Sequence, residues 1–444
     1  MEAEPVERKY PSARSAWYAL IILILLYSMS FMDRLILSLL ASSISADLNV
    51  SDTQIGILFG LGFGVVYSLT GLPLAHVIDK HNRIRLVTLG VLLWSACTVG
   101  SGFSSNYTQL MILRAGVAVG EAVLSPAAIS IIADIFPRDK RTLPTTAYTA
   151  VATFMGAGSF VLGGLALKVA QDVAPGIGLE PWQLTLVFVG VPGLLLAPLL
   201  FFTVREPKRV GEIKGQDFGS VKQALEYVSR ERRLYGCIFI AAAMMNLIGF
   251  AKTAWVPTLM IRAHGLTPVE AGMAYGTAGI LSGVAGAFLW PMLAKRWTAR
   301  GHRDALVLVY CGAITAGWML MALVGVTTST AVLLIASGAA GFFSTAGAVL
   351  IPLIIQFVTP GRMRARIMAG YLTANNLVGM AFGPPLCALI ADHFFEGEFA
   401  IGYALTTMIC FIGPVATLAA WLMRKSYVRA LDEAERRELS AAAA

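Results

Sequence analysis

Long apolar segments alternate with short polar segments along almost the whole chain. An apolar run of about 20 residues can cross a bilayer as an α-helix, and the runs here lack the strict alternation of β-barrel strands. The pattern predicts an all-α integral membrane protein with twelve transmembrane helices. We expect the spans at residues 17–42, 53–78, 84–104, 107–134, 143–170, 182–204, 234–261, 268–294, 304–326, 329–358, 366–392 and 400–423.

The first apolar run follows a basic N-terminus, as a cleaved signal peptide would. It continues, however, through Asp33 and Arg34 into another apolar stretch. The combined segment is longer than the apolar region of a signal peptide. We therefore interpret residues 17–42 as a retained first helix.

Basic residues concentrate in alternate loops. When the loops are assigned to two sides in turn, 29 of the 34 lysines and arginines fall on the side of both termini. Two, Lys168 and Arg262, fall on the other side. Short cytoplasmic loops carry such an excess of positive charge. We expect both termini in the cytoplasm and a multi-pass protein of the cell membrane, the inner membrane in a bacterium.

The longest hydrophilic stretch, residues 205–233, divides the chain into two six-helix halves, residues 1–204 and 234–444. Apolar residues recur within this linker at helical spacing, which predicts an interfacial amphipathic helix. They are Phe218, Val221, Leu225 and Val228. Two six-span halves are a known plan of secondary transporters, whose substrate site lies near the bilayer midplane between the halves.

Five charged residues lie deep inside the predicted spans, away from their ends, where each costs at least about 2.5–3.5 kcal/mol and is a functional candidate. They are Asp33 and Arg34 in the first span, Arg114 and Glu121 in the fourth, and Lys252 in the seventh. Arg114 and Glu121 are two helical turns apart, so they share one face, which should point to a cavity. We predict Glu121 as the proton-coupling residue and Asp33 as its rival; a static ion pair is the alternative. Lys252 either faces the cavity or extends to the membrane surface.

The loop after the second span begins with Asp79 and continues with Arg83 and Arg85. An acid followed by bases at a helix end can bridge to neighbouring helix ends. We predict a conformational lock here, and the alternative is an ordinary positively charged loop. In the same span Gly56, Gly60 and Gly64 are spaced by four, which predicts a close approach of another helix.

Composition excludes several classes of protein. The chain is 57% hydrophobic and 14% charged, whereas soluble domains carry about 25% charge. Its bases lie in short loops, so the net charge of +8 does not indicate nucleic-acid binding. The five cysteines have no metal-ligand spacing, and the sequence contains no P-loop or other catalytic motif. We therefore expect no metal, no cofactor and no enzymatic activity.

Several motifs together resemble the major facilitator superfamily, and the resemblance covers the whole chain. Residues 79–85 are similar to the signature after that superfamily's second helix, and residues 114–122 (RAGVAVGEA) to its fourth-helix signature. Residues 31–34 (FMDR), combined with 120–122 (GEA), are similar to the spinster branch. The glycine- and proline-containing segment 379–392 is similar to that branch as well.

The spinster resemblance implies transport of lysophospholipids or sphingoid lipids such as sphingosine 1-phosphate, with proton coupling. By this resemblance Asp33, Arg34, Arg114 and Glu121 are coupling and headgroup-binding residues. A cavity with buried cations, among which we count Lys252, also suits an anionic headgroup. We predict a monomeric, proton-coupled secondary transporter that moves an amphiphilic anionic lipid across the membrane by alternating access.

Two other functions fit the same fold. The chain could carry soluble organic anions, or it could be a broad drug exporter. A cavity open sideways to lipid, between spans five and eight or two and eleven, would favour the lipid. A receptor and a membrane-embedded enzyme belong to different classes. The short soluble tails argue against a receptor, and the lack of a nucleophile–base pair argues against an enzyme.

Overall fold

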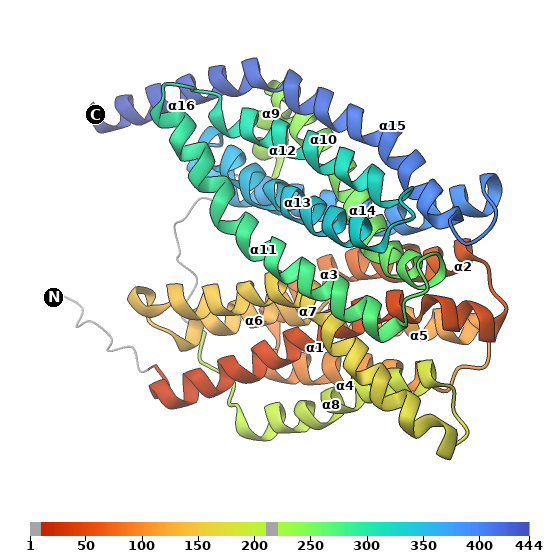
Figure 1. Cartoon of the computed structure of the whole chain (residues 1–444). Coiled ribbons are helices and arrows are strands. Elements are labelled where there is room, and N and C mark those ends of the chain that lie inside the picture. The colour runs from red at the N-terminus through yellow and green to blue at the C-terminus, as the bar shows by residue number, and fades with distance from the viewer. Residues whose placement is uncertain (1–9, 210–220, 444) are drawn as a thin grey trace.

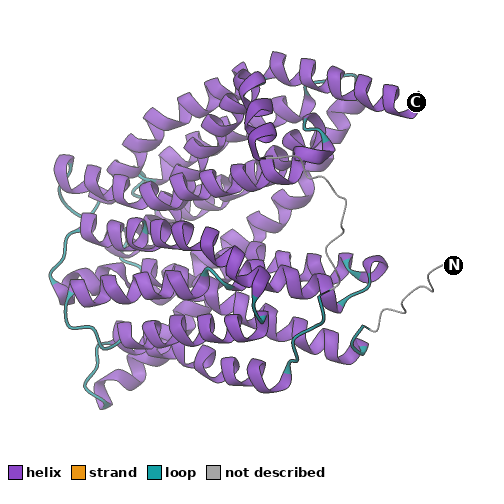
Figure 2. Ribbon diagram, turned by 180° about the vertical axis from the view of Figure 1, so that it is seen from behind, coloured by secondary structure: helices purple, strands orange, loops and turns teal. Residues whose placement is uncertain are grey.

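The computed structural model describes residues 10–209 and 221–443. Within these two ranges every regular element is a helix (Figure 2). Twelve helical segments there are long and apolar enough to cross a membrane. The predicted all-α class and the twelve spans are therefore confirmed for this part of the chain.

The first six spans contain eight α-helices, because the second and fourth spans are each interrupted. Their elements are α1 (Ala13–Leu48), α2 (Asp52–Phe59), the π-helix η1 (Leu61–Val65), α3 (Val66–Lys80), α4 (Arg83–Ser101), α5 (Tyr107–Glu121), α6 (Leu124–Ile135), α7 (Thr142–Val173) and α8 (Pro181–Thr203). Two 3₁₀ turns, η2 (Arg138–Lys140) and η3 (Ala174–Gly176), flank α7.

Each of the second six predicted spans corresponds to one continuous helix. These helices are α10 (Arg232–Arg262), α11 (Pro268–Ala299), α12 (Ala305–Val324), α13 (Thr330–Val358), α14 (Gly361–Phe394) and α15 (Ala400–Leu422). Two helices flank this set, α9 (Val221–Arg230) before it and α16 (Arg424–Ala443) after it.

Several helices extend beyond the predicted spans, because capping decides where a helix ends. The Ser12 hydroxyl accepts a hydrogen bond from the backbone N–H of Ser15 and caps the start of α1. α1 ends at Leu48, and the next residue, Asn49, has a φ of 49°, the left-handed geometry that commonly ends helices. The apolar pattern, by contrast, predicted an end at residue 42.

Gly60 marks the change from α2 to the π-helix η1 within the second span. α14 passes so close that a Cβ atom on Gly60 would lie 2.7 Å from the carbonyl oxygen of Ala381. At Gly56 a Cβ atom would lie 2.9 Å from the Pro384 oxygen. The predicted close approach at these glycines is confirmed, and the neighbouring helix is α14.

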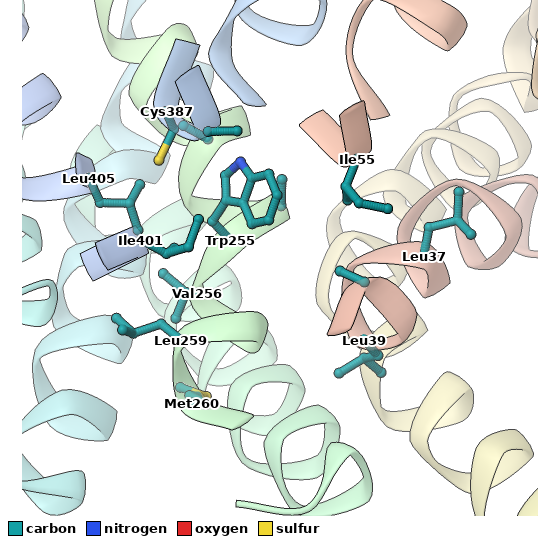
Figure 3. Close-up of a cluster of buried hydrophobic side chains, with 14 of the residues drawn as sticks. Leu37, Leu39, Ile55, Trp255, Val256, Leu259, Met260, Cys387, Ile401 and Leu405 are labelled. Carbon is teal, nitrogen blue, oxygen red and sulfur yellow. The ribbon is translucent and has the colours of Figure 1, made fainter. Parts of the chain in front are cut away.

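The helices form two groups, α1–α8 and α9–α16, which splay apart toward the end of the bundle that carries both termini (Figure 1). We call this end the termini end. At the opposite end hydrogen bonds join the groups, from the Thr53 backbone N–H to Asp392 (2.8 Å) and from Thr258 to the Ser38 carbonyl (3.3 Å). A buried apolar cluster also spans both groups there, with Leu37 and Ile55 on one side (Figure 3).

The linker helix α9 packs against the second group of helices. Ala224 is buried there, and the Tyr227 hydroxyl donates to the Val358 carbonyl at 3.0 Å. Leu225 points away and is exposed. Phe218, the first residue of the predicted amphipathic pattern, lies outside the described residues. The boundaries of the three predicted segments and the interfacial position of α9 stay predictions.

Candidate functional site

Four charged side chains meet near the middle of the first half, two from α1 and two from α5. Asp33 and Arg34 come from α1, and Arg114 and Glu121 come from α5, where their spacing places them on one face as predicted. Each acid pairs with the base of the other helix: Arg34 with Glu121, and Arg114 with Asp33. We call these four residues the buried quartet.

Glu121 is almost fully buried and is bound through one of its two carboxylate oxygens. Its Oε2 atom accepts from Arg34 Nη2 at 2.5 Å, from Arg34 Nε at 3.1 Å and from the Ser30 hydroxyl at 2.7 Å. Its other oxygen, Oε1, has no hydrogen-bond partner among the described residues. Glu121 therefore depends on a single guanidinium for charge compensation at short range.

Asp33 is held by a different set of groups. Arg114 Nη1 lies 3.2 Å from Asp33 Oδ1, and the Thr98 hydroxyl of α4 donates to Asp33 Oδ2. Both members of this ion pair are about 2% exposed. Burying two charges is costly unless they are paired and hydrogen-bonded, and here each acid has both kinds of partner.

Aromatic rings of the second span cover the two guanidinium groups. The Arg34 guanidinium carbon lies 5.0 Å from the centre of the Phe63 ring and 4.9 Å from that of Tyr67. The Arg114 carbon lies 5.3 Å from the Phe63 ring. At these distances cation–π attraction contributes about 0.5–2 kcal/mol. Ring and charge are brought together by η1 and α3, which sequence periodicity did not predict.

Arg34 is the most accessible member of the buried quartet, with a side chain that is 18% exposed. It lines a cavity of about 50 Å³ between the two halves, together with Ser38 from α1 and Phe250 and Thr253 from α10. This cavity has room for water beside the Arg34 guanidinium, whereas the Asp33–Arg114 pair does not line it.

Lys252 faces a larger cavity of about 510 Å³ that lies between α7, α10, α11 and α13. Among the described residues it has no ion-pair or hydrogen-bond partner, so it is a cation without a counterion. Ser337, which also lines this cavity, is buried with a hydroxyl that has no partner there either. Phe250 and Thr253 line both cavities and so lie between Arg34 and Lys252.

Five aromatic residues of the second half lie in different surroundings, and one of them, Phe250, lines both cavities. Trp255 and Tyr371 lie in buried apolar clusters. Phe342 and Phe343 pack against the indole ring of Trp290. All five lie in apolar spans, so the sequence could not distinguish a residue that lines a cavity from a residue of the buried core.

The loop after α3 does not bring its three candidate residues together. Arg83 is buried and pairs with Asp134 of α6 at 2.5 Å and with Glu206 of the linker at 2.8 Å. Asp79 and Arg85 are exposed. The position of Arg83 at the start of α4 turns its guanidinium toward α6 and the linker, and the conformational lock formed by Asp79, Arg83 and Arg85 stays a prediction.

An ion pair that joins the halves was missed by sequence reasoning. Arg262 at the end of α10 lies 2.7 Å from Asp52 at the start of α2, and its Nε donates to the Ser42 hydroxyl at 3.2 Å. We call Arg262 and Asp52 the latch. The sequence assigned Arg262 to one side of the membrane but could not give its partner in the other half.

A family model and several named relatives match this chain. The family model of the Major Facilitator Superfamily matches residues 23–384. An MFS-type efflux pump of Mycolicibacterium smegmatis is 28% identical over 95% of this chain and 96% of the relative. Protein spinster homolog 1 of Xenopus tropicalis is 26% identical over 91% and 80%. A probable galactarate/D-glucarate transporter of Bacillus subtilis is 24% identical over 63% and 66%.

The fold is similar to a solved structure as well. The crystal structure of a bacterial homolog to the human lysosomal transporter Spinster, inward-facing and unoccupied, matches with a TM-score of 0.81. The match covers 96% of this chain and 99% of that protein at 23% sequence identity. It shows that the two chains share one fold.

Proposed function

This chain belongs to the major facilitator superfamily, and from that premise we propose that it moves an amphiphilic anionic lipid in a proton-coupled cycle of alternating access. The chain is a multi-pass membrane protein and a secondary transporter, not an enzyme, as its sequence predicted. The lipid class we propose is a lysophospholipid or a sphingoid phosphate. Both termini lie in the cytoplasm in this proposal, so the latch closes the outer end.

The proposed substrate class rests on one observation, the unpaired positive charge of Lys252. An unpaired cation inside a membrane span is costly, and an anionic headgroup would supply the charge that the described residues do not. The Ser337 hydroxyl in the same cavity adds a hydrogen-bond donor for the headgroup oxygens. The monomeric protein needs no second chain to complete this site.

The position of the same cavity favours a lipid over a water-soluble anion. The cavity reaches the boundary between α7 and α11, the fifth and eighth spans. Small residues meet along this boundary: a Cβ atom on Gly279 would lie 2.6 Å from the Ala157 Cβ atom. Small residues let α7 and α11 approach closely here, so an acyl chain would pass into the bilayer at this boundary when the two helices separate during the transport cycle.

The Arg34–Glu121 pair supports the proposed proton coupling. An anionic headgroup that reaches Arg34 competes with Glu121 for the same guanidinium. Glu121 would then be left with Ser30 in a buried, low-dielectric position, where a carboxylate without a counterion takes up a proton. Substrate binding and proton binding are linked through this competition, with Asp33 as the rival proton site.

Uptake into liposomes tests the proposal. Purified protein would be reconstituted and supplied with lysophospholipids, sphingosine phosphate and small organic anions, each with and without a pH gradient. We expect gradient-dependent uptake of the anionic lipids. Uptake of the soluble anions alone would show that the substrate is a soluble anion and not a lipid. Equal uptake with and without a gradient would show that transport is not coupled to protons.

A carrier of soluble organic anions is the second candidate. The cavity beside Lys252 also holds Tyr275, Ser282 and Thr345, and such hydroxyl groups could bind a polyhydroxy acid. A relative named as a probable galactarate/D-glucarate transporter fits this candidate. A drug exporter of cations fits less well, because it would need a net acidic cavity and Lys252 adds a positive charge.

A further inference from the structure

A second large cavity lies at the termini end, apart from the site described above. Its volume is about 640 Å³, within the range of ligand pockets. All of its lining residues come from α11 to α13, α16 and the α11–α12 connection, and none comes from the first half. It is therefore separate from the path between the two halves.

Apolar side chains form most of the wall of this cavity. Pro291 comes from α11, Leu353 and Phe357 from α13, and Leu431 from α16. α16 runs beside the termini end of α11, as Figure 1 shows at its upper left. Phe357 is half-exposed, so this apolar wall is accessible from outside the helix bundle.

Basic residues gather at one end of the same cavity. Lys295 and Arg303 line it together with one acid, Glu435 of α16, and the segment 295–303 itself contains no acid. Just before this segment the exposed face of α11 is apolar, with Phe288 75% exposed. A change from exposed apolar to basic residues marks the level where acyl chains give way to headgroups.

Arg303 also holds α16 in place, through side chains that are about half-exposed. Its Nη2 atom lies 2.7 Å from Asp432 Oδ1 and 2.5 Å from Glu435 Oε2. Exposed ion pairs of this kind contribute little, so a phosphate could share the guanidinium at small cost. Lys295 has no ion-pair partner within the described ranges and is free to bind an anion.

We propose that this cavity binds an anionic phospholipid of the surrounding bilayer. One acyl chain lies against Leu353 and Phe357, and the phosphate lies between Lys295 and Arg303. The apolar wall favours an acyl chain, which a free anion lacks, and Lys295, which has no ion-pair partner among the described residues, favours a negative headgroup. The bound lipid stabilises α16 against the bundle, and this role is independent of what the transporter carries.

Native mass spectrometry of the full chain, purified from bilayers with phosphatidylglycerol or phosphatidylcholine, tests this site. We expect retention of phosphatidylglycerol and about tenfold lower occupancy in the double variant Lys295→Gln with Arg303→Gln. The matched control Arg300→Gln, on an exposed base that does not line the cavity, should retain the lipid. Asp432→Asn with Glu435→Gln should retain it too, because α16 loses its ion pairs while both bases stay.

Two further measurements make the test specific. Leu353→Trp, which fills the apolar part, should also lower phosphatidylglycerol occupancy, and excess inorganic phosphate should not displace the lipid. Equal retention of both lipids, or equal retention by the Lys295/Arg303 double variant and the Arg300→Gln control, would overturn the proposal. Displacement by inorganic phosphate would also overturn it, because the site would then bind a free anion.

Discussion

Arg34 and Glu121 form a 2.5 Å ion pair across two helices, although Glu121 has another arginine, Arg114, on its own helix. Arg114 is occupied by Asp33 instead. The consequence is a division of the buried quartet into one pair that borders a cavity and one that is closed off. The pair that borders the cavity is suited to exchange partners during transport.

Glu121→Gln should abolish the dependence of transport on a pH gradient. The amide can still accept hydrogen bonds from Ser30 and Arg34 but cannot take up a proton, so binding of the lipid should change by less than about tenfold. Liposome uptake with and without a gradient, together with a binding isotherm, measures both effects. The control Glu398→Gln, on an exposed acid, should behave like the wild type, and full gradient-driven uptake by Glu121→Gln would contradict the assignment.

Arg114→Ala should impair both binding and coupling and should lower thermal stability. It leaves the Asp33 carboxylate buried without its base, a loss that costs about 3–5 kcal/mol. Arg114→Gln combined with Asp33→Asn removes both charges and should recover much of that stability. Thermal unfolding in detergent measures the difference, and a double variant no more stable than Arg114→Ala would show that the ion pair does not matter.

Lys252→Met should weaken transport of anionic lipids selectively. The substitution keeps an unbranched side chain in the cavity but removes its charge, so we expect the KM for an anionic lysolipid to rise about tenfold. The KM for a lysolipid with a zwitterionic headgroup should change much less. Lys168→Met, on an exposed face of α7, is the matched control; an equal rise for both headgroups would remove Lys252 from the site.

Arg262→Gln should shift the protein toward the state that is open at the latch end. The latch is partly exposed, with side chains 26% and 14% accessible, so its loss should cost about 1 kcal/mol. Distances between spin labels on α2 and α10 at that end would report the change. Asp52→Asn should produce the same shift, and unchanged distances in both variants would mean that the latch does not hold the halves together.

Asp79→Asn should shift the population in the other direction, toward the state open at the termini end. Asp79 is exposed in the present structure, and we expect it to meet a helix end or base of the second half when the termini ends approach. The effect should not exceed about 1–3 kcal/mol. Spin labels at the termini ends test this, with Arg85→Gln for comparison; an unchanged distance distribution would leave the loop as a topology signal.

The sequence predicted the parts of the site that depend on distance along one helix. The two-turn spacing of Arg114 and Glu121 placed them on one face, and the glycines at 56, 60 and 64 predicted a close helix neighbour. Membrane burial identified all five charged candidates, because a charge in an apolar span is rare and costly.

Partners across the bundle could not be predicted, because periodicity gives the face of a helix but not its neighbour. The crossed pairing of Arg34 with Glu121 depends on how α1 packs beside α5. In the same way Arg262 finds Asp52 only when the halves meet, and Arg83 finds Asp134 only when α4 lies beside α6. For Lys252 the sequence left two interpretations, a binding residue or a side chain that extends to the membrane surface. Only the position of the cavity in the structure distinguishes them.

Proton uptake on substrate binding is the most direct test of the competition for Arg34. Purified protein in weakly buffered solution with a pH indicator would receive a lysolipid with a sulfate headgroup, which does not titrate near neutral pH. We predict uptake of protons by the wild type and none by Glu121→Gln. No uptake by the wild type, or uptake that persists in Glu121→Gln and disappears in Asp33→Asn, would contradict the account.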